Sequence, residues 1–255
     1  MSRLRRAVAL VAVALPAALA AQGAPARDYI VGGGDVRFAL RAGADQPLAQ
    51  GEFFDFTTDL LTLSRRSFLA PAGEAELGWR LGTRAELVVS AGFARSSAGS
   101  EYRRLVGTDD LPIAQRTTLQ RIPVAVGVRY NLRTPGRRAG SLAYVPTRGL
   151  VPWVAAGGGA MRWRLEQAGE FVFENDAIDP ATFRASRWAP MAHAGGGIDW
   201  LVGTRTSVTL DARYTWARRA FPAAPQRPGT VGGFEGFDPL DLSGIAIRAG
   251  LSWRL

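Results

Sequence analysis

The amino-acid sequence predicts an all-β protein that folds as an eight-stranded antiparallel up-and-down transmembrane β-barrel. Apolar and polar residues alternate with a period of two in segments that recur along the chain after residue 34, which is the pattern of β-strands. The connections between the segments are alternately short and long, as in a series of hairpins whose two ends meet different surroundings. The polar face of the segments mixes glycine, alanine and serine with charged residues, which suits the crowded interior of a narrow barrel.

Eight alternating segments are the predicted strands of this barrel, and they cover 35–43, 67–81, 84–97, 115–132, 150–165, 187–201, 205–217 and 240–255. Residues 82–83 and 202–204 are short glycine-containing connections that are typical of β-hairpin turns. The connection 133–149 is longer, and it is predicted to form a hairpin on the side of the short turns. The long connections on the other side are rich in glycine, proline, aspartate and aromatic residues, and they are 44–66, 98–114, 166–186 and 218–239.

Residues 1–21 are predicted to be a secretory signal peptide. Three arginines within the first six residues precede a short apolar run, and the run ends in the small-residue sequence at 18–20. The apolar run is too short for a transmembrane helix. The sequence therefore predicts an exported protein with a signal peptide at 1–21, a short N-terminal segment at 22–34 and a β-barrel domain at 35–255.

The composition excludes several kinds of chemistry. The chain contains no cysteine, so neither disulfides nor thiolate metal sites stabilise it. All 31 basic residues are arginine, which removes the lysine that a phosphate-binding loop or a Schiff base requires. The formal net charge is +9, but the arginines are spread along the strands and form no basic patch, so nucleic acid is not expected as a partner.

The last predicted strand illustrates how the two strand faces differ. Ile245, Ile247 and Leu251 lie on one face, and Arg248 and Arg254 lie on the other among small residues. A soluble barrel or sandwich with the apolar face inside is one interpretation of this pattern. A transmembrane barrel with the apolar face outside is favoured for two reasons. The apolar faces end in aromatic residues, as the girdles of such barrels do. A strand of about 12 residues that is tilted by about 40° rises roughly 30 Å, which is the height of the apolar layer of a membrane with its aromatic girdles. The predicted girdle residues are Trp79, Trp153, Trp163, Trp188, Trp200, Tyr214, Trp216 and Trp253.

Three segments carry a resemblance to a known family: VPWVAAGGGAMRW at 151–163, HAGGGIDWLVGTRTSVTLDARY at 193–214 and DLSGIAIRAGLSWRL at 241–255. They resemble the small eight-stranded outer-membrane barrels of Gram-negative-type bacteria, the OmpA-like and opacity-protein-like family. The resemblance implies a monomeric, porin-like protein of the outer membrane, surrounded by outer-membrane lipid. It also implies periplasmic chaperones and the barrel-assembly machinery as partners during biogenesis. Members of the family usually end in Phe or Trp, whereas this sequence ends in Leu255.

Charged residues on the polar faces are predicted to share the lumen. An eight-stranded barrel is only wide enough to be filled by its own side chains, and a buried charge without a partner is costly. The charges are therefore predicted to pair into a structural plug, while the excess of arginine leaves a narrow anion-preferring pore as an alternative. The predicted lumen residues are Arg37, Arg41, Arg80, Arg121, Arg129, Arg162, Arg164, Arg213, Arg248 and Arg254 with Glu74, Glu76, Glu86, Asp199 and Asp211.

His193 is the single histidine of the chain, and it is predicted to lie in the lumen, hydrogen-bonded to its neighbours. One histidine without cysteine gives no metal site, and no catalytic or cofactor-binding residue is predicted. The resemblance adds a lipid-modifying barrel enzyme as a further alternative, because lipid-A deacylase barrels use a His-x-Ser pair on one strand. Here His193 is followed by Ala194 and Gly195, so the serine of that pair is missing.

The glycine runs at 32–34, 157–159 and 195–197 are predicted to allow close backbone approach or strand bending, since none opens a predicted helix as a phosphate site requires. Exposed aromatic residues on loops that a rigid scaffold holds suit the binding of a partner. The connections 166–186 and 218–239 are therefore the predicted sites for a surface ligand. The predicted function is an outer-membrane barrel that is structural or surface-binding through its extracellular loops, without catalysis.

Overall fold

The computed structural model describes residues 30–31, 34–107, 110–140, 143–173, 177–222, 234 and 236–255. The predicted signal peptide at 1–21, the residues 22–29 and the first two glycines of the run 32–34 lie outside the described residues. No helix in the described ranges is both long and apolar enough to cross a membrane.

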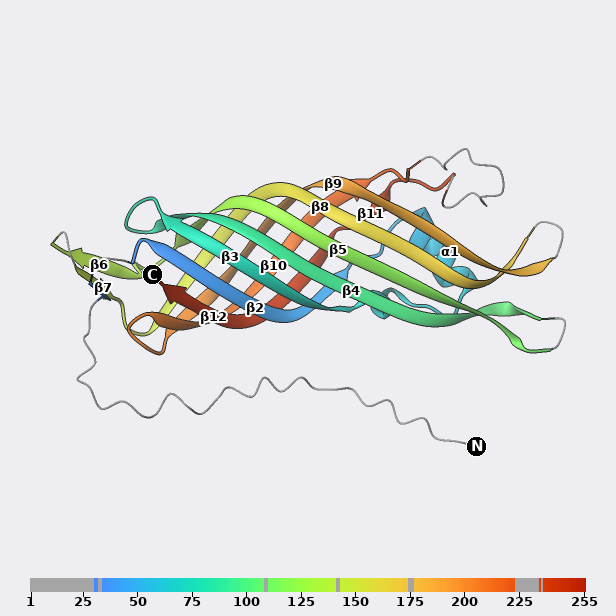
Figure 1. Cartoon of the computed structure of the whole chain (residues 1–255), viewed down its shortest axis with the longest axis horizontal. Coiled ribbons are helices and arrows are strands. Elements are labelled where there is room, and N and C mark those ends of the chain that lie inside the picture. Colours follow the sequence, from blue (N-terminus) through green and yellow to red (C-terminus); the bar gives the residue numbers. More distant parts are fainter. Residues whose placement is uncertain are drawn as a thin grey trace, which may run out of the picture.

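Eight long strands form a closed antiparallel barrel in the described part of the chain (Figure 1). Each strand pairs with the next long strand along the chain, and the last one pairs with the first, which closes the barrel. Where the eight strands pair around the ring, no sheet edge is left free, so the strands can satisfy their backbone groups within the barrel wall. The predicted eight-stranded up-and-down barrel is confirmed. Its strands are β2 (Val36–Pro47), β3 (Ala70–Arg80), β4 (Ala85–Val106), β5 (Pro112–Asn131), β8 (Leu150–Val172), β9 (Ile178–Leu201), β10 (Thr206–Arg219) and β12 (Gly244–Arg254).

The two ends of the barrel differ. The short turns between β3 and β4 and between β9 and β10 lie at one end, together with the start of β2 and the end of β12 (Figure 1). We call this the turn end, and we call the opposite end, with the longer connections, the loop end. When paired residues are traced from strand to strand once around the barrel, the path that starts at one residue of β10 comes back to β10 about ten residues further along the chain. In a barrel of eight strands, this stagger corresponds to a strand tilt of about 40° from the barrel axis.

The connection 133–149 forms a hairpin at the turn end, as predicted. Strands β6 (Gly136–Ala139) and β7 (Ala143–Pro146) pair antiparallel within it. Strand β1 (Ile30–Val31) pairs with β7, so the described part of the N-terminal segment becomes the third strand of a small sheet. This third strand was not predicted, because two residues are too few to display a period.

The prediction of two of the long loops is wrong, because strands continue through most of their residues. The connection 98–114 belongs largely to β4 and β5, and the connection 166–186 belongs largely to β8 and β9 (Figure 1). Glu101 of β4 pairs with Ala114 of β5, and Glu170 of β8 pairs with Pro180 of β9, so each pair of strands stays joined beyond the ends that the sequence predicted. Beyond the apolar layer the outward face of these strands is polar, which removes the alternation that marks a strand in the sequence.

The connection 44–66 contains a helix that the sequence analysis did not predict. Helix α1 (Glu52–Leu60) is followed by the short helix η1 (Arg65–Phe68), and both lie at the loop end (Figure 1). Phe53, Phe54 and Thr57 form the buried face of α1. Strand β11 (Leu240–Asp241) pairs with the end of β10 at the same end of the barrel.

The outer wall of the barrel is apolar. Leu210 is 49% exposed and Ile247 is 59% exposed, although the interior of a soluble protein would bury both. Trp188 and Trp200 of β9 face outward at the two ends of this apolar zone, and their spacing corresponds to a height of roughly 30 Å. The exposed side chains of this apolar belt include Leu40, Leu77, Val89, Val124, Val126, Ile198, Leu210, Ile245 and Ile247. The prediction that the apolar faces point outward is confirmed for these strands.

Two tryptophans predicted for the outer girdle are inside the barrel. Trp153 is 4% exposed and Trp163 is 0% exposed, so the prediction of their position was wrong. Glycine and alanine fill much of β8 between the two tryptophans, which leaves no contrast between polar and apolar faces from which to read the orientation of the strand. The other predicted girdle residues lie at least partly exposed: Trp79, Trp188, Trp200, Tyr214, Trp216 and Trp253.

Candidate functional site: the lumen and its two ends

Charged side chains fill the middle of the lumen. The ionic network, as we call it, consists of Arg37, Arg41, Arg129, Arg213, Arg248 and Arg254 with Glu74, Glu76, Glu86, Asp199 and Asp211. All of these side chains are buried or nearly buried. Six arginines thus face five carboxylates, so the charges of the network almost balance.

Glu74 lies at the centre of the ionic network. Its carboxylate accepts hydrogen bonds from Arg41 at 2.9 Å, from Arg213 at 2.5 Å and from Arg248 at 2.5 Å. The three arginines belong to β2, β10 and β12, so one carboxylate on β3 connects four strands across the lumen. Hydrogen bonds between charged groups are the strong ones, and burial keeps water from competing for them.

Glu76 and Glu86 carry the ionic network toward the turn end. Glu86 accepts hydrogen bonds from Arg37 at 2.9 Å and from Arg254 at 2.8 Å. Glu76 pairs with Arg37 and also accepts two hydrogen bonds of 2.9 Å from Arg41. Arg37 and Arg41 are each shared between carboxylates, so they join most of the ion pairs into one connected set. Arg129 and Asp199 form a separate pair beside it.

Trp153 packs against the ionic network from the opposite wall. Its ring lies 4.2 Å from the Arg129 guanidinium and 5.6 Å from that of Arg41, and its indole Nε1 donates a hydrogen bond of 3.2 Å to Asp199. A Cβ atom at Gly197 would lie 2.7 Å from this ring. The glycine run at 195–197 therefore leaves room for a tryptophan, which agrees with the predicted close approach.

His193 is buried in the lumen, as predicted. A Cβ atom at Gly157 would lie 2.9 Å from its ring, so the run at 157–159 leaves room for the histidine. The predicted hydrogen bonding is not found at Nδ1 of His193, which has no partner among the described residues.

Two arginines predicted for the lumen lie on the outer wall. Arg162 and Arg164 are exposed, because β8 turns its odd-numbered residues inward. Their prediction failed for the same reason as that of the two β8 tryptophans. Arg121 is buried and pairs with Asp45 at 2.9 Å, and Arg80 lies at the turn end, nearly buried.

Aromatic side chains fill the lumen at the loop end. The aromatic plug, as we call it, consists of Phe53, Phe54, Phe68, Trp163, Phe221, Phe234 and Phe237. The Phe53 ring lies 5.8 Å from Phe221 and 5.4 Å from Phe234, and the Trp163 ring lies 5.8 Å from Phe221. Helix α1 thus brings an apolar face over the end of the barrel, where it packs with Leu119 and Leu165 of the wall.

The described aromatic residues of the connection 218–239 point into the barrel end, although the sequence analysis predicted them to be exposed. They were expected to be exposed for ligand binding, whereas Phe234 is buried and Phe221 and Phe237 are half-buried in the aromatic plug. Residues 223–233 and 235 lie outside the described residues. The described aromatic residues of this connection pack against helix α1. The sequence carried one signal for this helix, because Phe53, Phe54 and Thr57 are spaced so that they share one helical face.

Tyr144 of β7 covers the lumen at the turn end. Its side chain is buried beneath the barrel, and the guanidinium groups of Arg80 and Arg254 lie 4.2 and 5.6 Å from its ring. A Cβ atom at Gly136 would lie 2.3 Å from this ring, which explains the need for glycine at that position. Three groups of side chains thus lie along the described lumen: Tyr144 at the turn end, the ionic network in the middle and the aromatic plug at the loop end.

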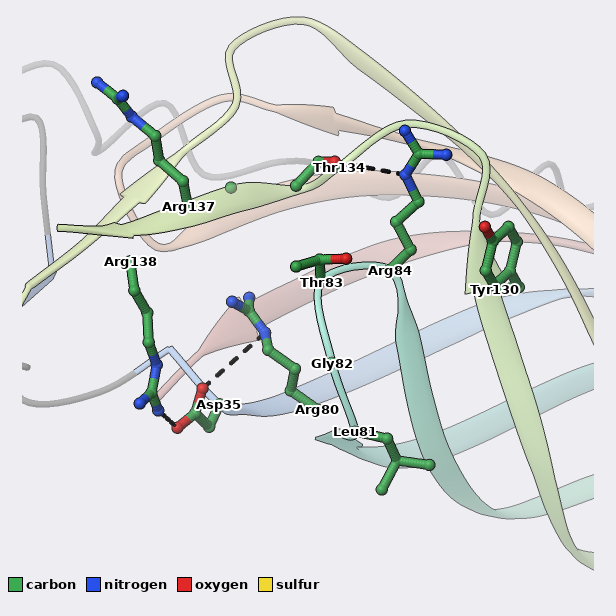
Figure 2. Close-up of a pocket in the computed structure, with 11 residues that line it drawn as sticks. Asp35, Arg80, Leu81, Gly82, Thr83, Arg84, Tyr130, Thr134, Arg137 and Arg138 are labelled. Atoms are coloured by element: carbon green, nitrogen blue, oxygen red, sulfur yellow. Dashed lines mark hydrogen bonds and ion pairs between the residues drawn. The ribbon is translucent and has the colours of Figure 1, made fainter. Parts of the chain in front are cut away.

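A cleft of about 900 Å³ opens at the rim of the turn end, between the turn after β3 and strand β6. Figure 2 shows that Asp35 lies between Arg80 and Arg138 and pairs with both, whereas Arg137 points away from it. Arg84 lies across the turn and donates a hydrogen bond of 3.5 Å to Thr134. Since the arginines outnumber the carboxylate, this rim is basic.

A closed barrel with an apolar outer wall, aromatic girdles and a charged interior defines a class of protein, the small transmembrane β-barrel of the outer-membrane type. No protein-family model and no characterised sequence matches the chain. Solved structures do match. The chain is similar to the outer membrane protein OprG of Pseudomonas aeruginosa, with 11% identity over 86% of this chain and 95% of that one and a TM-score of 0.46.

Two further solved structures match at a comparable level. A major outer membrane protein of Thermus thermophilus has 12% identity over 86% of this chain and 99% of that one, with a TM-score of 0.46. Neisserial surface protein A has 9% identity over 90% of this chain and 98% of that one, with a TM-score of 0.43. The fold class stands on the strand pairing of the barrel itself.

Proposed function

We propose that this protein is a closed, non-conducting barrel of the outer membrane that serves as a rigid scaffold for a binding surface at its loop end. In this proposal the turn end faces the periplasm and the loop end faces the outside, as the lengths of the connections favour. The observation that supports the proposal is the burial of Tyr144, of the ionic network and of most of the aromatic plug along the described lumen.

The electrostatics of the lumen favour a plug over the anion-preferring pore. A pore selective for anions needs a positive charge that a passing ion can use, whereas each arginine of the network that contacts Glu74 is already paired. Opening a path would separate buried ion pairs, which costs several kcal/mol for each unpaired charge. The aromatic plug would also have to move, because it covers the loop end of the same path.

A non-catalytic role is supported by the surroundings of the charged groups. The carboxylates of Glu74, Glu76 and Glu86 accept hydrogen bonds from arginines and are buried. A general acid or base must reach a substrate proton, directly or through one water molecule. Buried beneath an aromatic plug and already bonded, these carboxylates suit a structural role.

The loop-end surface is the proposed binding surface. Strands β4 and β5 extend beyond the apolar belt as a paired ribbon, in which Ser97 and Thr118 are hydrogen-bonded at 3.0 Å. Near the tip of this ribbon, Val106 and Leu111 are exposed. Exposed apolar side chains near the tip of a paired ribbon suit contact with a partner protein or surface.

Planar-bilayer recording tests the closed lumen. The refolded protein is expected to give no discrete conductance steps, because in this proposal the ionic network and the aromatic plug close the aqueous path through the narrow barrel. Discrete anion-selective steps would contradict the proposal and would support the pore alternative. Heat-modifiable gel migration of the same sample shows that the tested barrel is folded.

A further inference from the structure

The outer wall carries a polar groove just beyond the apolar belt on the loop-end side. The outer groove, as we call it, has a volume of about 330 Å³, and it is lined by Gln120, Ile122, Arg162, Arg164, Arg184 and Ser186, with Ala185. These residues come from β5, β8 and β9, which are paired strands of the barrel wall. The groove thus lies on a rigid sheet.

The strand register fixes the height of the outer groove on the wall. Arg162 pairs across the sheet with Ile122 on one side and with Trp188 on the other. Trp188 belongs to the girdle, and the Arg162 guanidinium lies 6.0 Å from its ring. The groove therefore begins where the apolar belt ends, which is the level of lipid headgroups in the loop-end leaflet.

The outer groove has more cations than anions. Glu166 is the carboxylate beside it, and it accepts hydrogen bonds from Arg164 at 2.9 Å and from Arg184 at 3.0 Å. Arg162 donates a hydrogen bond of 3.4 Å to Ser186 and has no carboxylate partner in the described residues. Three guanidinium groups thus face one carboxylate, and the side chains of Arg164 and Arg184 remain half-exposed.

We propose that the outer groove binds the phosphate of a lipid headgroup in the loop-end leaflet. A guanidinium fork matches a phosphate in shape and charge, and it can donate two hydrogen bonds to it. The exposed Trp188 and Val124 lie on the belt side of the groove, where the acyl chains of the same lipid would run along the wall. A soluble anion would use the arginines alone, whereas a lipid also uses the apolar side chains beside them.

Native mass spectrometry of the detergent-refolded full chain tests this proposal. The probe is diphosphorylated lipid A, titrated beside its dephosphorylated form. The change of three arginines to glutamine in R162Q/R164Q/R184Q is expected to weaken the affinity for the phosphorylated probe about tenfold, because each arginine near an anionic headgroup contributes to binding. The matched control R84Q/R137Q/R138Q removes the same charge from the turn end and is expected to bind like the unaltered protein.

Glu166 provides a second, opposite variant. E166Q removes the competing carboxylate and frees two guanidinium groups, so the affinity for the phosphorylated probe is expected to rise about threefold. A merely structural role of the arginines would not produce this gain. Heat-modifiable migration verifies that each variant is folded, and E166Q tests the proposal even if the triple variant does not fold.

Three results would overturn the proposal. The first is equal binding of the phosphorylated and dephosphorylated probes, and the second is an equal loss of affinity in the turn-end control. The third is complete competition by inorganic phosphate at the concentration of the lipid, which would make the groove a site for a soluble anion. The proposal does not depend on a closed lumen, so conductance in a bilayer would leave it unaffected.

Discussion

The replacement of Glu74 by glutamine is expected to lower the free energy of unfolding by about 3–5 kcal/mol. The side chain keeps its size, but Arg41, Arg213 and Arg248 lose the carboxylate that they share. Three buried guanidinium groups would then repel one another across the lumen. Equilibrium unfolding in urea, in phospholipid vesicles, measures the loss.

The matched control for this variant is E101Q, which neutralises an exposed carboxylate on β4. Its free energy of unfolding is expected to change by at most about 0.5 kcal/mol, as for most surface substitutions. The double variant E74Q/R213Q removes one charge of each sign and is expected to recover part of the loss. If E74Q were as stable as E101Q, the ionic network would not hold the barrel together.

The replacement of Trp163 by alanine is expected to cost about 3–5 kcal/mol of the free energy of unfolding. Trp163 is fully buried and packs against Phe221 in the aromatic plug, so its removal leaves a cavity that the surrounding strands cannot close. The same urea titration in vesicles measures this loss.

The control for Trp163 is W216A, on the outer wall. Trp216 is exposed, so lipid can fill the space that its ring leaves, and a smaller loss is expected. The comparison separates two tryptophans that the sequence assigned to the same girdle. Equal losses in the two variants would contradict the position of Trp163 inside the barrel.

The sequence predicted the barrel because the apolar layer imposes a strict alternation on the strands that cross it. In β10, Leu210 and Trp216 alternate with Asp211 and Arg213, and the structure turns the first pair outward and the second pair inward. The carboxylates and arginines on such strands could be assigned to the lumen from the pattern alone. The ion-pair partner of each charged residue could not be predicted from the pattern, because the stagger of the strands decides which residues meet across the barrel axis.

The predictions failed where the alternation is absent. In β8, glycine and alanine between Trp153 and Trp163 hide the orientation of the strand, and this reversed the expected positions of Arg162 and Arg164. Beyond the apolar layer the outward strand faces are polar, so the extended parts of β4 and β5 read as loops. Helix α1 is short and follows a glycine, and only its packing against the barrel explains its buried face.

The orientation of the strand faces is the claim on which the rest depends, and site-directed spin labelling of β10 tests it directly. The chain contains no cysteine, so single cysteines at 208 to 216 can be labelled without background. In bilayers, labels at 208, 210, 212, 214 and 216 are expected to meet oxygen from the lipid, and labels at 209, 211 and 213 are expected to be shielded and immobile. Water contact at Leu210 and Ile247, with Arg213 and Arg248 enclosed by apolar atoms, would contradict the account.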